Sequence, residues 1–410
     1  MRNLRVDGER LWRSMMTMAE IGATAKGGVC RLTLSDEDKA SRDLFIEWCR
    51  AIGCTIRVDA MGNIFARRAG RNDDLPPVVI GSHLDSQPTG GKYDGAYGVL
   101  AGLEVLRTLD ERAIETDRPI EVVSWTNEEG ARFSPAMLGS SVYAGVADLA
   151  YGQGRTDHDG KSVGEELERI GYRGGDDLAG RPLACYIEPH IEQGPILEAE
   201  GKTIGVVTGG QGVAWYDVAV TGADAHAGPT PIAMRRDALL AAAAMLLRIR
   251  ELAVAEAPAG RSTVGEFRIE PGSRNTIPGK VEFTVDLRHP ERETLARMDE
   301  GLRALIAQTA GEHGVDAAVE RIWLSDPIAF DADVVQAVRA GADLCGYSHR
   351  EIISGAGHDA FHLSTICPTA MIFVPCKDGV SHNEAESALP GDVEAGCNVL
   401  LHAVLERARG

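Results

Sequence analysis

The first third of the chain alternates short apolar runs with stretches of helical periodicity. Residues 77–80 and 119–125 are β-branched and bounded by turn residues, which predicts buried strands. Residues 95–109, between them, carry apolar side chains at helical spacing, and Ser35 precedes an acidic first turn of another helix that ends before Gly53. Helices that alternate with buried strands predict an α/β layer domain with a largely parallel sheet.

The pattern changes at Gly212. Strands and helices are expected from here in the order βαββαβ, at residues 213–220, 232–254, 263–269, 280–287, 291–313 and 316–323. This order is typical of a ferredoxin-like unit, in which two helices cover one face of an antiparallel sheet. After Asp326 the α/β pattern returns, with a strand at 370–374 and a helix at 391–407.

Composition narrows the classes of partner. The 410 residues suffice for two or three domains, and a net charge of −19 disfavours nucleic acid and anionic membranes as partners. No apolar run approaches the roughly 20 residues of a membrane span, and the charged first twenty residues lack the pattern of a signal peptide. The eight cysteines include no C-x-x-C pair, which indicates reduced thiols. We therefore expect a cytoplasmic protein whose partners are neither nucleic acids nor membranes.

The first candidate for chemistry follows the predicted strand at 77–80. His83 is a potential metal ligand, and Asp85 could accept a hydrogen bond from the other ring nitrogen. Asp94, in a glycine-rich turn, could bridge two cations with its two oxygens. Strand ends are where α/β sheets place their ligand sites, although a His-x-Asp pair taken alone is more often a structural hydrogen-bonded pair.

The second candidate is the acidic pair Glu128 and Glu129, directly after the strand at 119–125. Neighbouring carboxylates repel unless a cation or a shared proton relieves them, and a metal site would use one as ligand and the other as general base. A solvated acidic turn is the alternative. His190 and His382 also follow short apolar runs, where each by itself could be structural.

Taken together, three imidazoles and two carboxylates lie at predicted strand ends: His83, Asp94, Glu129, His190 and His382. This set suits two divalent ions, Zn²⁺ first, with Mn²⁺, Co²⁺ or Ni²⁺ possible in vitro. Because these residues lie both before Gly212 and after Asp326, we predict a discontinuous catalytic domain of residues 1–211 and 326–410. Residues 212–325 would then form an inserted lid.

Six ordered motifs carry a resemblance that covers nearly the whole chain. They are GSHLDSQPTGGKYDGAYGVLAG, NEEGARF, EPHIEQGPILE, GADAHAGPTP, SRNTIPG, and GAGHDA followed by SHNEAE. In these the chain resembles the hydantoinase/carbamoylase-type amidases, which include N-carbamoyl-L-amino acid hydrolases, allantoate amidohydrolases and β-ureidopropionases. The resemblance implies a three-layer, zinc-exopeptidase-like α/β catalytic domain with an inserted ferredoxin-like lid and dimerisation domain.

The resemblance also implies a role for each candidate. His83, Asp94 and His190 would hold one metal ion, with Asp94 bridging to a second ion held by Glu129 and His382. Asp85 would orient His83, and Glu128 would act as general base. Contacts to the substrate or its transition state are implied for Gln193, His226, Asn275 and Arg288. Without the resemblance, the last three would be taken as a surface histidine, a turn asparagine and a strand-end arginine.

The implied activity is hydrolysis of the ureido C–N bond of N-carbamoyl-L-amino acids or related ureido acids to amino acid, CO₂ and ammonia. A peptidase or aminoacylase on the same scaffold is an alternative, disfavoured because broader peptidase relatives place a carboxylate where this chain has His190. An idle metal-binding protein is a third hypothesis, which the presence of Glu128 beside all five ligands disfavours. A homodimer through the inserted domain is expected, since its edge strands need covering, with His226 serving the partner's site.

Overall fold

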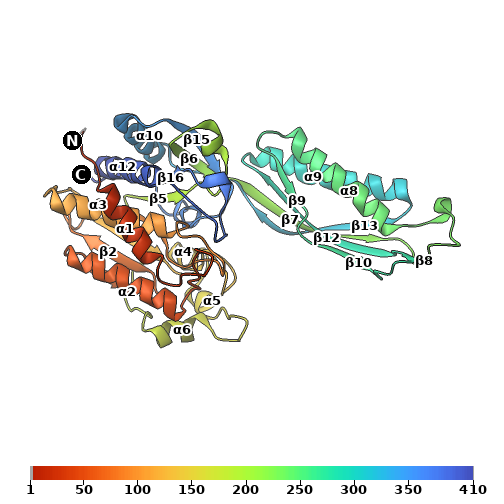
Figure 1. Cartoon of the computed structure of the whole chain (residues 1–410), viewed down its shortest axis with the longest axis horizontal. Coiled ribbons are helices and arrows are strands. Elements are labelled where there is room, and N and C mark those ends of the chain that lie inside the picture. Colours follow the sequence, from red (N-terminus) through yellow and green to blue (C-terminus); the bar gives the residue numbers. More distant parts are fainter. Residues whose placement is uncertain (1–2, 410) are drawn as a thin grey trace. The chain divides into compact units, whose positions relative to one another are not determined.

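The computed structural model describes residues 3–409 of the chain. Two compact units are present. One consists of the residues up to Thr208 and those from Phe330 onward, and the other of Gly209–Ala329. Figure 1 labels the helices and strands of both units.

The first unit is built on a mixed sheet of nine strands, in the order β1-β2-β4-β3-β5-β16-β6-β14, with β15 paired to β6. The strands are β1 (Thr55–Val58), β2 (Ile64–Arg68), β3 (Val78–His83), β4 (Ile120–Trp125), β5 (Cys185–Ile191), β6 (Ile204–Gly210), β14 (Ile328–Ala329), β15 (His349–Ser354) and β16 (Thr369–Val374). The four central strands β4, β3, β5 and β16 are parallel. The flanking pairs are antiparallel, so the prediction of a largely parallel sheet is correct for the centre and wrong for the flanks.

Helices cover this sheet, and the longer ones are α1 (Gly8–Met18), α2 (Asp36–Ala51), α3 (Ala96–Glu111), α10 (Ala332–Cys345) and α12 (Pro390–Arg407). Shorter helices are α4 (Leu138–Tyr143), α5 (Leu149–Gln153), α6 (Val163–Ile170), α7 (Ile196–Glu200) and α11 (Asp359–Leu363). The α3 helix is buried on nearly all sides, because it packs on β3 and β5 and is covered in turn by α1 and α12 (Figure 1). The Ser35 side chain caps α2 by accepting from the Asp38 N–H, as the sequence predicts.

The second unit is an antiparallel sheet with two helices on one face (Figure 1). Its strands are β7 (Gly212–Thr221), β9 (Arg261–Thr263), β10 (Phe267–Glu270), β12 (Lys280–His289) and β13 (Asp316–Ser325), in the order β10-β12-β7-β13, with β9 also on β12. Alternate β7 side chains, from Ala214 to Val220, form a core with α8 (Ala238–Ala255) and α9 (Arg292–His313). This is the arrangement expected of a ferredoxin-like unit.

Two predicted elements of this unit differ in detail. The expected helix at 232–254 is a short 3₁₀ turn, η1 (Ile232–Met234), followed by α8, because Asp237 caps the Leu239 and Leu240 N–H groups and starts the helix there. The expected strand at 263–269 is interrupted around Gly265 and forms β9 and β10, which both pair with β12. A small separate ribbon joins β8 (Ala225–His226) to β11 (Thr276–Ile277).

Within residues 3–409, none of the helices combines the length and the apolar character that crossing a bilayer requires. All eight cysteines are unpaired, and six of them are buried.

Candidate active site

The central parallel strands bring distant segments of the sequence to one edge of the sheet. His83 is the last residue of β3, and His190 is the penultimate residue of β5. The acidic pair Glu128 and Glu129 follows the end of β4, and His382 lies in the loop after β16. Because these strands are parallel neighbours, their carboxyl ends meet, as the strand-end pattern predicts.

The first group of potential ligands consists of His83, Asp94 and His190, all buried. Asp94 Oδ1 lies 3.5 Å from His83 Nε2 and 3.2 Å from His190 Nε2. The turn after Asp94 requires a glycine: Gly95 has φ of 64°, and a Cβ there would lie 2.3 Å from the His83 ring. The backbone therefore packs directly against the first ligand.

The second group consists of Asp94, Glu129 and His382. His382 Nε2 lies 3.4 Å from Asp94 Oδ2 and 3.3 Å from Glu129 Oε2. The imidazole of His382 is half exposed, in contrast to the buried first group. Since one Asp94 oxygen faces each group, Asp94 has the geometry of a bridging ligand.

The spacing of the donor atoms fits metal ions. In a tetrahedral zinc site with bonds of about 2.0–2.1 Å, ligand atoms lie about 3.3–3.4 Å from one another. The four donor separations here range from 3.2 to 3.5 Å. Imidazole nitrogens and carboxylate oxygens are also the donors that borderline divalent ions prefer, so both groups fit such ions.

The electrostatics of the site also favour a cation. Burial raises the pKa of Glu129 to about 8, and the Asp94 charge adds to this. Burial likewise raises the pKa of Glu128 well above its usual value. Burial by itself would lower the pKa of His83, but the Glu128, Asp94 and Asp85 carboxylates outweigh it and hold that pKa well above its usual value. Buried carboxylates at this density require protons or metal ions to offset their repulsion.

Glu128 belongs to neither ligand group, yet its Oε2 lies 3.4 Å from His83 Nε2. The side chain is buried. It therefore lies beside the first group without completing it, the position that a base needs to reach a reacting water.

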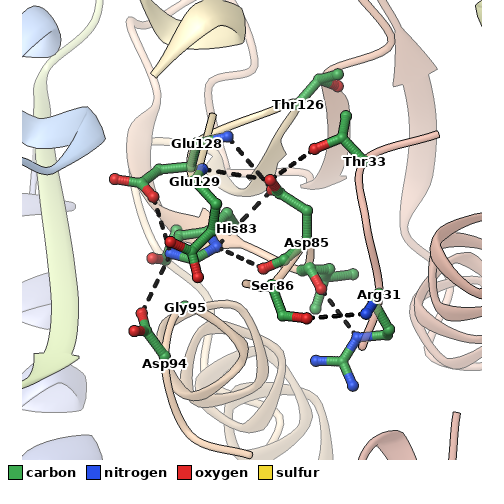
Figure 2. Close-up of polar contacts among 12 residues, drawn as sticks. Arg31, Thr33, His83, Asp85, Ser86, Asp94, Gly95, Thr126, Glu128 and Glu129 are labelled. Atoms are coloured by element: carbon green, nitrogen blue, oxygen red, sulfur yellow. Dashed lines mark hydrogen bonds and ion pairs between the residues drawn. The ribbon is translucent and has the colours of Figure 1, made fainter. Parts of the chain in front are cut away.

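Asp85 contacts His83 differently from the prediction. The Asp85 backbone carbonyl lies 2.9 Å from His83 Nδ1, whereas its nearest carboxylate oxygen is 3.8 Å away. The carboxylate instead accepts hydrogen bonds from the Thr33 hydroxyl and from the backbone N–H groups of Glu128 and Glu129 (Figure 2). The expected hydrogen bond between the Asp85 carboxylate and the His83 ring is thus replaced by one to the Asp85 carbonyl. The carboxylate faces the loop that carries Glu128 and Glu129 instead.

The predicted substrate residues fall in both units. In the first, Gln193 donates from Nε2 to Asp94 Oδ2 at 3.0 Å. In the second, His226 and Asn275 lie together, since Thr276 is opposite His226 and the Asn275 carbonyl accepts from the Ala227 N–H. Arg288, also in the second unit, donates from Nε and Nη2 to the Asp286 carboxylate. Their contacts with a substrate remain predictions.

Three residues next to the ligands were missed from the sequence. Glu386 is buried and accepts from the backbone N–H groups of Tyr93 and Asp94, and Gln87 donates to both oxygens of Glu129. The His358 ring lies against His190, with centroids 4.6 Å apart. Glu386 and His358 lie within the motifs SHNEAE and GAGHDA, which were the available signal, but the sequence offers no way to derive their contacts.

The mixed sheet and the two ligand groups at its edge define a class of protein, the α/β proteins with a candidate two-metal centre at the carboxyl ends of parallel strands. Residues 79–406 match the model of peptidase family M20/M25/M40. The chain belongs to this family.

Named relatives within the family are similar over their whole length. The chain is 48% identical over 406 residues to an N-carbamoyl-L-amino-acid amidohydrolase of Rhizobium meliloti, covering 99% of this chain and 98% of that one. It is 38% identical over 409 residues to the corresponding enzyme of Geobacillus stearothermophilus, covering 99% and 100%. A solved hydantoinase/carbamoylase family amidase from Burkholderia multivorans shares 58% identity, with a TM-score of 0.97 and 99% of each chain covered. The resemblance drawn from the motifs is confirmed.

Proposed function

We propose that this chain hydrolyses the ureido C–N bond of N-carbamoyl-L-amino acids or related ureido acids to amino acid, CO₂ and ammonia. The observation that carries the proposal is Asp94 between two ligand groups, with Glu128 beside them but in neither group. The identity to N-carbamoyl-L-amino-acid amidohydrolases over nearly the whole chain supports the substrate class. The free cysteines and the acidic composition support a cytoplasmic location.

His83, Asp94 and His190 would hold one ion, and Asp94, Glu129 and His382 a second, with Zn²⁺ the first candidate for both. When bound, two such ions lower the pKa of a water and polarise the carbonyl that it attacks. Mn²⁺, Co²⁺ or Ni²⁺ would suit the same donors in vitro.

Glu128 would accept the proton of the attacking water and return it to the leaving amine. A carboxylate in a buried pocket, with its pKa raised, suits both halves of this cycle, because it can hold the proton between them. His226 would donate a hydrogen bond to the developing oxyanion, and Arg288 would bind the substrate carboxylate. Gln193 and Asn275 would complete the contacts to the ureido acid. The carbamate product then decomposes to CO₂ and ammonia.

The test is ammonia release from purified protein with a panel of N-carbamoyl-L-amino acids, N-carbamoyl-β-alanine and allantoate. Dipeptides and N-acyl amino acids serve as comparison substrates for the peptidase and aminoacylase hypotheses. We expect turnover of at least one ureido acid, its loss on chelation and its return with Zn²⁺, Mn²⁺ or Co²⁺. Turnover confined to dipeptides or N-acyl amino acids would contradict the proposal, and absence of all turnover would favour an idle metal-binding protein.

We also propose that two copies pair through their second units. On α8, Leu240, Leu247 and Val254 form an apolar stripe at seven-residue spacing, with exposures of 55%, 68% and 54%. The edge strand β13 exposes Trp323 as well, and an edge strand needs a cover. In a dimer with a two-fold axis, this surface of one subunit packs against the same surface of the other subunit.

Light scattering on the wild type should give the mass of two chains, and Leu247→Glu should shift it toward one chain. Leu389→Glu is the matched control, because Leu389 is equally exposed, at 67%, but lies in the first unit. A second experiment mixes Glu128→Gln subunits with His226→Ala subunits. It tests whether His226 acts in the active site of the partner subunit. Recovered activity would support His226 acting in the partner's site, and an inactive mixture would contradict it.

A further inference from the structure

The segment at residues 29–33 lies outside the part of the chain that the family model matches, which begins at residue 79. It nevertheless runs along the loop that follows β3. Val29 and Gly90 exchange backbone hydrogen bonds of 3.0 Å in both directions. Arg31 donates from its backbone N–H to Ser86 Oγ at 2.8 Å, and its carbonyl accepts from the Ser86 N–H at 2.9 Å. The segment is therefore hydrogen-bonded along the loop that carries Asp85.

The last residue of the segment, Thr33, contacts the Asp85 carboxylate (Figure 2). Its hydroxyl donates to Asp85 Oδ2 at 2.7 Å, and both residues are 1% exposed. This is the shortest of the three hydrogen bonds that the carboxylate accepts, the other two being 3.3 Å long. A donor–acceptor distance of 2.7 Å is the usual length of a well-formed O–H···O hydrogen bond.

The two longer bonds come from the backbone N–H groups of Glu128 and Glu129. The carbonyl side of the same turn is held separately, because the Glu128 carbonyl accepts from the Met137 N–H at 2.7 Å. The N–H groups of this turn, in contrast, donate to the Asp85 carboxylate. Asn127 in this turn has φ of 60°, a conformation that asparagine adopts more readily than most residues, and its side chain donates to the Phe133 and Pro135 carbonyls. The Asp85 carboxylate is thus the acceptor for two successive N–H groups of this turn.

We propose that Thr33 is a positioning residue for the active site. Its hydroxyl holds the Asp85 carboxylate against the backbone amides of Glu128 and Glu129. This contact fixes the position of the Glu128 carboxylate and of the ligand oxygen of Glu129. The Thr33 hydroxyl bonds to Asp85, which is not one of the five candidate metal ligands. The part that concerns Glu128 rests on the proposed function, whereas the part that concerns Glu129 requires only metal binding.

The main test is Thr33→Val, which keeps the shape and removes the hydroxyl, compared with Thr33→Ser, which restores it. We expect Thr33→Val to lower kcat by about 10-fold with KM within about twofold, because a single buried hydrogen bond is lost and no proposed substrate contact changes. Calorimetric titration of metal-free protein with Zn²⁺ should show weaker binding at one of two sites. Thr33→Ser should recover most of both losses.

Thr108→Val is the matched control. Thr108 is also buried and its hydroxyl also donates to a carboxylate, that of Glu104, but it lies within α3. We expect kcat, KM and Zn²⁺ affinity to stay at wild-type values in this variant. If Thr33→Val does not fold, Thr33→Cys keeps the size with a weaker donor and should show a partial loss.

Three results would overturn the proposal. One is a folded Thr33→Val protein with wild-type kcat and Zn²⁺ affinity, and another is an equal loss in Thr33→Ser, which would assign the effect to packing of the methyl group. The third is wild-type behaviour of Thr33→Cys where the Val variant fails to fold. Failure of the proposed function is distinguishable, because the wild type would then hydrolyse no ureido acid while the Zn²⁺ titrations still report on Glu129.

Discussion

Glu386 Oε1 accepts a hydrogen bond of 3.1 Å from the backbone N–H of Asp94, a residue 292 positions earlier in the chain. The same oxygen accepts from the Tyr93 N–H at 2.9 Å. Glu386 Oε2 lies 2.9 Å from the hydroxyl of Ser381, the neighbour of His382. The buried Glu386 carboxylate therefore connects the loop that carries Asp94, the ligand shared by both groups, to the loop that carries His382.

We expect Glu386→Ala to weaken Zn²⁺ binding at both sites by about 10-fold or more, since two buried N–H groups lose their acceptor and Asp94 loses its support. Glu384→Ala is the control, because Glu384 lies in the same loop but its carboxylate accepts from the Thr24 hydroxyl and not from the Asp94 backbone. Calorimetric titration of metal-free protein measures both variants. Equal effects of the two substitutions would show that only the loop, and not the Glu386 carboxylate, matters.

Glu128→Gln should retain two metal ions and lose roughly 10²- to 10⁴-fold in kcat, because an amide has the shape of the carboxylate but cannot carry the proton. Glu129→Gln should instead lose affinity for one ion. Metal analysis and steady-state kinetics on the same preparations separate the two neighbours. Near-normal turnover of a metal-replete Glu128→Gln protein would assign the base to another residue.

Metal affinity should rise with pH between 6 and 8. The Glu129 carboxyl, with its pKa raised to about 8 by burial, carries a proton below that pH in the metal-free protein, and an arriving ion must displace it. From the ionised fraction of this one group, affinity at the site should be about 50-fold weaker at pH 6 than at pH 8. Titration in buffers of different ionisation enthalpy will count the protons released. A pH-independent affinity would contradict the proton displacement.

Arg288→Lys should raise KM for ureido acids about 10-fold or more even though the charge is kept, because a guanidinium binds a carboxylate through two N–H groups and an ammonium does not. Asp286, which accepts from Nε and Nη2, holds the guanidinium in place. Arg268→Lys is the control, since Arg268 is an exposed arginine on β10 of the same unit. Equal hydrolysis of ureides that lack the carboxylate would argue against this role of Arg288.

The sequence by itself determined the features that depend on neighbours along the chain. Apolar periodicity located the strands β3, β4 and β16 and the helices α2, α3, α8, α9 and α12, and Ser35 identified the start of α2. It also placed four candidate ligands after parallel strands, namely His83, Glu129, His190 and His382, and parallel packing of those strands brings them together with Asp94, which lies in the turn before α3. The motifs revealed the family because they lie in order over nearly the whole chain.

Only the tertiary structure decided which atoms meet at those strand ends. It turned the Asp85 carboxylate from His83 toward Thr33 and the acidic turn. It also brought Glu386 to the backbone of Asp94. It made the outer strands of the first sheet antiparallel, which short apolar runs do not reveal because such runs are buried in either direction. A hydrogen bond depends on distances of a few tenths of an ångström between segments far apart in the chain, and packing of the whole domain sets those distances.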